Sequence, residues 1–123
     1  MAKILIIDDD ELVLNALSNV LHHAGHELFI TADGPRSIEL YKEHRPDVVI
    51  LDLGLPTTSG MDVLGEVRKI NAGAKVIMIS GYTAPAVVTE AKEKGAYAFL
   101  EKPFEIKTLI NLITSIAEPT PNQ

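Results

Sequence analysis

Four short apolar segments of this 123-residue chain each end on a polar side chain. Runs rich in Ile, Val and Leu are typical of strands buried on both faces of a parallel sheet. In open α/β sheets, ligands bind in the crevice outside the carboxyl ends of such strands. We therefore expect acids, a hydroxyl and an ammonium group to meet at one edge of a sheet. The segments and their end residues are KILII with Asp8 and Asp9, DVVIL with Asp52, KVIMI with Ser80, and YAFLE with Lys102.

The stretches between these segments have the period of amphipathic helices. Val13, Leu17 and Leu21 recur at four-residue spacing after the first run, and Asp10 is a good N-cap for that helix. A further strand is predicted over residues 27–32. Five strands alternating with five helices predict a three-layer α/β fold. The expected sheet is doubly wound and parallel, in the flavodoxin-like order 2-1-3-4-5.

This strand order makes the first and third strands neighbours. The expected consequence is that Asp8 and Asp9 lie beside Asp52, although more than forty residues separate them in the chain. Like charges at about 4 Å repel by roughly 4 kcal/mol at an effective dielectric near 20. Mg²⁺ would relieve this repulsion, because it prefers carboxylate oxygens together with water and phosphate oxygens.

The length and composition indicate a single domain over residues 1–117, with 46% hydrophobic residues to form its core. The segment 118–123 contains two prolines and no apolar residue, so we interpret it as a tail or the start of a linker. No apolar stretch is long enough for a membrane span. A net charge of −6 with scattered basic residues argues against direct binding of nucleic acid. The absence of cysteine suits a cytoplasmic protein.

Four motifs in this order give the chain a resemblance to a known family. ILIIDDDE is followed by VVILDLGLP, with Gly60 shortly after it, then by VIMISG and finally by FLEKPF. From Lys3 to about Ile116, the chain resembles the receiver domains of two-component response regulators, which include the single-domain chemotaxis regulator. The resemblance implies a protein that is phosphorylated on itself and changes conformation, rather than an enzyme acting on a separate substrate.

The resemblance implies a role for each matching residue. Asp52 is the expected phosphoacceptor, and its donor is a histidine kinase or a histidine phosphotransfer protein. Asp9, Asp52 and the backbone carbonyl of Gly54 are expected to bind Mg²⁺, with Asp8 assisting. Ser80 is the expected switch hydroxyl that bonds a phosphoryl oxygen.

Three further residues match the family at its last strand. Lys102 is expected to contact the phosphoryl group, and Pro103 matches a proline held in cis. Phe99 occupies the aromatic switch position, but it has no hydroxyl, so packing alone must carry its response. The expected output is a changed surface around the fourth helix and fifth strand, recognised by a downstream protein. A phosphorylation-dependent homodimer through the last two helices stays open, because no charge pattern requires it.

Three other functions are compatible with parts of this pattern. A receiver used only for docking would keep the fold without being phosphorylated. A phosphatase of the haloacid dehalogenase type is suggested by Asp8-x-Asp10, but the later order of acid, hydroxyl and lysine does not match that class. A flavodoxin-like FMN protein would share the fold, but a triple aspartate is a poor phosphate-binding loop.

Overall fold

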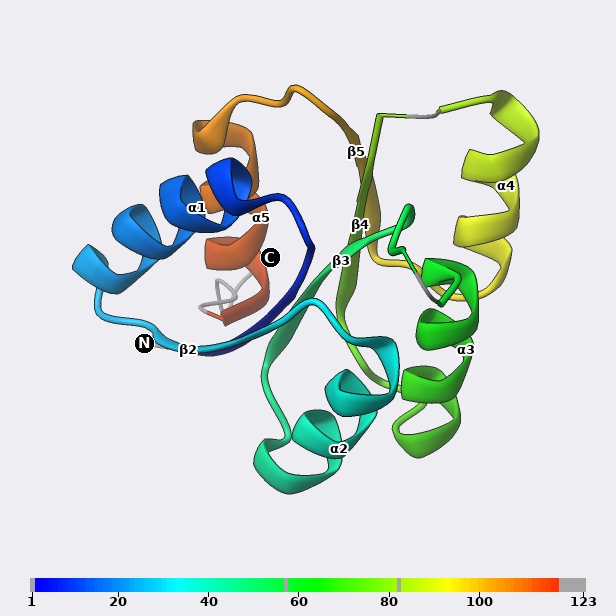
Figure 1. Cartoon of the computed structure of the whole chain (residues 1–123), viewed down its shortest axis with the longest axis horizontal. Helices are drawn as coiled ribbons and strands as arrows, with labels where there is room; N and C mark the ends of the chain where they lie inside the picture. Colours follow the sequence, from blue (N-terminus) through cyan, green and yellow to red (C-terminus); the bar gives the residue numbers. More distant parts are fainter. Residues whose placement is uncertain (1, 57, 82, 118–123) are drawn as a thin grey trace, which may run out of the picture.

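A computed structural model describes residues 2–56, 58–81 and 83–117 of the chain, and Figure 1 shows its helices and strands. Strands and helices alternate along the whole described sequence. In chain order they are β1 (Lys3–Ile7), α1 (Glu11–His23), β2 (Glu27–Thr31), α2 (Gly34–His44), β3 (Val48–Asp52), α3 (Gly60–Ile70), β4 (Val76–Ser80), α4 (Pro85–Glu93), β5 (Ala98–Glu101) and α5 (Ile106–Ala117). The expected tail 118–123 lies outside the described residues.

The five strands form one parallel sheet in the order β2-β1-β3-β4-β5. This is the predicted doubly wound arrangement, and the prediction is confirmed. β3 and β4 are fully buried along their length, whereas the edge strands β2 and β5 are only partly covered. Polar residues at or just after the ends of β1, β3, β4 and β5 are therefore brought to the same edge of the sheet.

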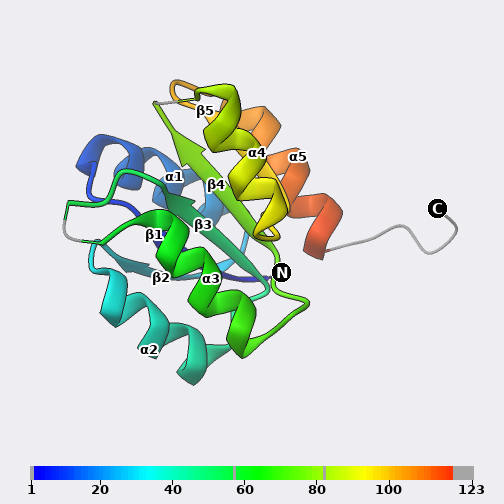
Figure 2. The same cartoon turned by 90° about the vertical axis from the view of Figure 1, so that its right-hand side faces the viewer.

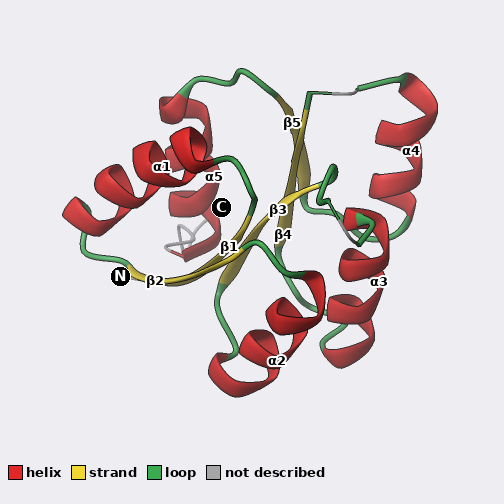
Figure 3. Cartoon of the chain, in the orientation of Figure 1, coloured by secondary structure: helices red, strands yellow, loops and turns green. Residues whose placement is uncertain are grey.

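Helices cover both faces of the sheet and create two separate cores. Figure 1 shows α1 and α5 on one side and α2, α3 and α4 on the other, and Figure 3 shows the strands between these helical layers. In Figure 2 the side with α2, α3 and α4 faces the viewer. Side chains of each inner strand alternate between the cores, so that Ile4 and Ile6 pack towards α1 and α5 while Leu5 and Ile7 pack towards α2 and α3.

Local sequence signals determine where the elements begin and end. The carboxylate of Asp10 accepts hydrogen bonds from the backbone amides of Leu12 and Val13, as expected for the N-cap of α1. β2 ends at Thr31, one residue earlier than predicted, because the Thr31 hydroxyl accepts a hydrogen bond from the amide of Asp33 and starts the turn into α2. Among the described residues, no helix is both long enough and apolar enough to cross a membrane.

Candidate functional site

Three carboxylates meet where β1 and β3 end. Asp8 is completely buried, Asp52 is 6% exposed and Asp9 is exposed. One oxygen from each of these carboxylates lies within 4.8 Å of one oxygen from each of the others. The sequence predicted that Asp8, Asp9 and Asp52 would come together, and the adjacent positions of β1 and β3 bring them there.

Lys102 brings a positive charge to this cluster from the end of β5. Its ammonium nitrogen lies 3.1 Å from Asp8 Oδ2 and 3.2 Å from Asp52 Oδ2. The other oxygen of each carboxylate accepts a backbone hydrogen bond, from the amide of Asp10 to Asp8 and from the amide of Gly54 to Asp52, both at 2.9 Å. Both buried carboxylates are therefore held in place by one local amide and one shared cation.

Burial and the ion pairs shift the pKa values of Asp8 and Lys102 in opposite directions. Burial raises the pKa of Asp8, although the hydrogen bond from the Asp10 amide and the contact with Lys102 oppose the rise, while Asp52 adds to it. For Lys102, burial alone would lower the pKa, but contacts with Asp8 and Asp52 outweigh it, so that the pKa is raised. Lys102 therefore stays charged at neutral pH.

The donor set at this site fits a divalent cation. Three carboxylates and one ammonium leave two uncompensated negative charges. In addition, the buried oxygen Asp8 Oδ2 accepts no hydrogen bond of good geometry from the described residues, although it forms an ion pair with Lys102. A hard cation such as Mg²⁺ takes ligands of this kind. Because Asp9 is exposed, water molecules could reach the same site as further ligands.

The remaining predicted residues lie around the same edge. Ser80 is 4% exposed at the end of β4, the strand next to Asp52 in the sheet. Phe99 is half-buried in β5, next to Met78 in register, and packs against the core on the α4 side. The peptide bond between Lys102 and Pro103 is cis.

Gly60 brings the start of α3 against the loop that follows Asp52. A Cβ at position 60 would lie 2.6 Å from the Cα of Leu53 and 2.7 Å from the carbonyl oxygen of Asp52. The amide of Gly60 also donates a hydrogen bond to the carbonyl of Leu53. This close approach of two backbone segments explains why a glycine stands at this position.

We expect Gly60→Ala to lower the free energy of unfolding by about 1–3 kcal/mol, because the added methyl group meets backbone that must move. Urea unfolding would measure the change. Gly65→Ala in the same helix is the matched control, since a Cβ there meets nothing within 4 Å. That substitution should stabilise the protein by roughly 0.5–1 kcal/mol through helix propensity. Equal stability of the Gly60 variant and the wild type would contradict the packing argument.

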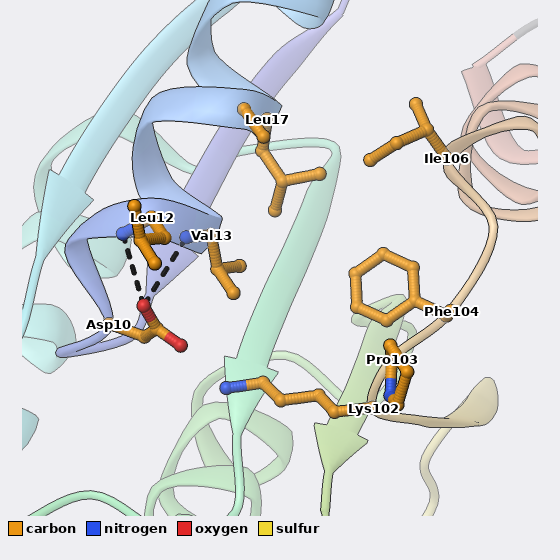
Figure 4. A pocket seen from close by; sticks show the side chains of 9 residues that line it. Asp10, Leu12, Val13, Leu17, Lys102, Pro103, Phe104 and Ile106 are labelled. Atoms are coloured by element: carbon orange, nitrogen blue, oxygen red, sulfur yellow. Dashed lines mark hydrogen bonds between the residues drawn. The ribbon is translucent and has the colours of Figure 1, made fainter.

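An apolar pocket of about 370 Å³ lies beside Lys102, and the sequence alone did not indicate it. Figure 4 shows Val13 and Leu17 of α1 facing Phe104 and Ile106 across this pocket. Its lining combines residues about ninety positions apart, which explains why no local pattern predicted it. Leu12, also in the lining, is 82% exposed.

Known proteins share both the sequence pattern and the fold. The family model of the response regulator receiver domain matches residues 4–114. The chain belongs to this family. The chemotaxis protein CheY of Thermotoga maritima is 32% identical over 117 residues, which cover 94% of this chain and 98% of that protein. Sporulation initiation phosphotransferase F of Bacillus subtilis is 33% identical over 104 residues, 85% of this chain and 84% of that protein.

A solved structure agrees with these relatives. A chain in the CheX-CheY-BeF3-Mg²⁺ complex from Borrelia burgdorferi matches with a TM-score of 0.85 and 29% sequence identity, over 94% of this chain and 88% of that one. The protein is thus a phosphoacceptor receiver domain of a two-component response regulator. Receivers act with histidine kinases or phosphotransfer proteins and with downstream targets. The family match decides against the flavodoxin-like and dehalogenase-like alternatives.

Proposed function

We propose that this receiver is phosphorylated on Asp52, with Mg²⁺ held by Asp8, Asp9, Asp52 and the backbone carbonyl of Gly54. The observation that carries the proposal is the pair of buried carboxylates bridged by Lys102 beside an exposed third acid. The related chain from Borrelia burgdorferi was solved with BeF3 and Mg²⁺, which supports this choice of metal. When bound, the metal neutralises charge on the phosphoryl oxygens.

The proposed reaction transfers a phosphoryl group from a phosphohistidine donor. A carboxylate oxygen of Asp52 forms a bond to phosphorus while the bond from phosphorus to the imidazole nitrogen breaks, and the electron pair leaves on that nitrogen. The Gly54 amide fixes the orientation of the Asp52 carboxylate through Oδ1. Lys102, already 3.2 Å from Asp52 Oδ2, is placed to contact the incoming phosphoryl oxygens.

The proposed switch begins at Ser80 and Lys102. The phosphoryl group carries about −1.5 to −2 charges where the Asp52 carboxylate carried −1, and its oxygens give a hydroxyl and an ammonium near Asp52 new acceptors. A charge-assisted hydrogen bond is worth about 1.5–3 kcal/mol, enough to shift two loop states by roughly tenfold to a hundredfold. Phe99 then repacks against α4, and the changed surface of α4 and β5 signals to a downstream protein or a second copy of the chain.

Incubation with acetyl phosphate and Mg²⁺, followed by intact-mass measurement, tests the proposal. We expect the mass of one added phosphoryl group, and we expect EDTA to prevent its addition. If the wild type remains unmodified and BeF3⁻ with Mg²⁺ produces no change in its NMR spectrum, the protein is a receiver used only for docking. Continuous release of phosphate from added esters would instead revive an enzymatic function.

We propose that the histidine donor docks over the apolar pocket beside Lys102. The donor must bring an imidazole to Asp52, and this pocket opens at the same edge of the sheet. Its lining is largely apolar, and Leu12 projects from the first turn of α1 with 82% of its surface exposed. An exposed leucine beside a reactive group is suited to bury its side chain against a partner.

We therefore expect Leu12→Gln to slow phosphoryl transfer from a protein donor by about tenfold, because burying a leucine is worth roughly 1.5–3 kcal/mol. Labelling by acetyl phosphate should stay within about twofold of the wild type, since a small donor needs no docking surface. Ile30→Gln is the matched control, because Ile30 is also exposed but lies on the edge strand β2. Equal slowing with both donors would show damage to the site rather than lost docking.

We also expect the protein to act in the cytoplasm, where its phosphohistidine donors and a reducing environment are both found. The absence of cysteine from the sequence is compatible with that environment.

A further inference from the structure

A side-chain hydrogen bond joins the loop before α4 to the end of β5. The hydroxyl of Thr83 donates to Glu101 Oε2 at 3.3 Å. Thr83 lies between Ser80 and the start of α4, and Glu101 is the last residue of β5, immediately before Lys102. Figure 1 shows the chain leaving β4 towards α4 and leaving β5 towards α5, so this bond connects two segments as they diverge.

The order of the strands shows towards which strand this bond holds Thr83. β4 lies between β3, which carries Asp52, and β5, which carries Glu101. In the proposed switch, a phosphoryl group on Asp52 attracts the Ser80 hydroxyl, and with it the residues that follow, towards β3. The bond between Thr83 and Glu101 holds the same loop towards β5. The two interactions therefore oppose each other.

Among the described residues, the start of α4 has no side-chain cap and is held mainly by the packing of Val87 against the core. This helix begins after Ala84 without a side-chain N-cap, and Ala91 is its one buried residue. Helices α1, α2 and α3 all have a side-chain cap, from Asp10, Asp33 and Ser59. A single hydrogen bond to a weakly anchored segment has a large influence on where the segment rests.

Glu101 also shares a face of the sheet with Phe99. Residues two apart in a strand point to the same side, and Phe99 packs with the core beneath α4. Lys102, the next residue, turns the opposite way and contacts Asp8 and Asp52. The end of β5 thus places Lys102 beside Asp52, while Glu101 bonds Thr83 in the loop before α4.

We propose that the hydrogen bond between Thr83 and Glu101 is an autoinhibitory contact that holds the β4–α4 loop in its unphosphorylated position. The inhibitory role rests on the proposed phosphorylation of Asp52. Breaking the contact raises the population of the active arrangement before any phosphoryl group is added. Because a neutral donor and an exposed carboxylate contribute a modest net amount, the expected shift is about twofold to tenfold.

The test compares Thr83→Val, Glu101→Ala and the double variant. BeF3⁻ with Mg²⁺ should bind each single variant about twofold to tenfold more tightly, because apparent affinity rises with the fraction already in the binding-competent state. The double variant should gain no more than either single variant, since both remove the same bond. Thr83→Ser keeps the hydroxyl and should behave as the wild type. Glu93→Gln, an exposed acid on α4, controls for the lost charge.

Hydrogen exchange of the free protein gives a second readout that needs no phosphorylation. We expect faster exchange of the Val87 and Val88 amides, in the first turn of α4, when Thr83 is replaced by valine. Unchanged exchange, or additive effects of the two substitutions on BeF3⁻ affinity, would overturn the proposed contact. Faster exchange in a protein that neither binds BeF3⁻ nor accepts phosphate would instead overturn the proposed phosphorylation and the inhibitory role together.

Discussion

Asp52→Asn should abolish phosphorylation while leaving the fold intact. An amide oxygen is a poor nucleophile compared with a carboxylate, so incorporation of phosphate from acetyl phosphate should fall by more than about a thousandfold. The amide of Gly54 can still donate to the Asn carbonyl, because that hydrogen bond needs only an oxygen acceptor. Loss of one like charge beside Asp8 offsets the lost contact with Lys102, so stability should change by about 1 kcal/mol or less.

Asp10→Asn is the matched control for this substitution. Asp10 is an exposed acid two residues from Asp8, and its side chain caps α1 rather than facing the cluster. Asparagine caps helices as well as aspartate, so phosphorylation and stability should both be kept. Intact mass and urea unfolding would be measured for both variants. Phosphate incorporation in the Asp52 variant equal to that in the Asp10 variant would place the acceptor elsewhere.

Much of the fold was predictable because buried parallel strands have a simple sequence pattern. VVIL before Asp52 and VIMI before Ser80 are continuous apolar runs, and both are fully buried in the structure. Strand order could be predicted because few arrangements satisfy right-handed crossovers with five strands. The convergence of Asp8, Asp52 and Lys102 then followed from the order, since residues that end neighbouring parallel strands share one edge.

The sequence could not predict how these side chains share their contacts. Asp8 and Asp9 are adjacent and chemically identical, yet one is completely buried and the other exposed, because successive residues of an extended chain face opposite ways. Lys102 bridges Asp8 as well as Asp52 because its flexible side chain adopts a conformation that contacts both carboxylates, and the sequence does not specify that conformation. The bond between Thr83 and Glu101 joins a loop to the end of a strand, and no periodic pattern encodes such a contact.

Lys102→Ala should keep the fold but lose about 3 kcal/mol of stability at neutral pH without Mg²⁺. That value is at the low end for breaking a buried ion pair, because the Lys102 side chain is 20% exposed. Its loss leaves Asp8 buried beside Asp52 without a cation. Mg²⁺ affinity should be kept or increased, since Lys102 pairs with Asp8 and Asp52, two of the carboxylates proposed to hold the metal, whereas the response to BeF3⁻ should be lost.

The pH dependence separates this electrostatic cost from simple loss of packing. Asp8 already has a raised pKa in the folded protein, so its ionisation lowers stability as pH rises from the unfolded value of 3.8 towards the folded value. Without Lys102 the folded pKa rises further, and the loss of stability extends to higher pH. Urea unfolding should therefore show a deficit that is small near the unfolded pKa and grows towards neutrality.

Two controls make the interpretation of the Lys102 variant specific. Lys107→Ala removes an exposed lysine from α5 and should change stability by about 0.5 kcal/mol or less. Adding Asp8→Asn to the Lys102 variant removes the uncompensated charge and should recover most of the lost stability. A deficit that is independent of pH and persists in the double variant would mean that Lys102 acts by packing. In that case the charge of Lys102 would not explain how the site responds to a phosphoryl group.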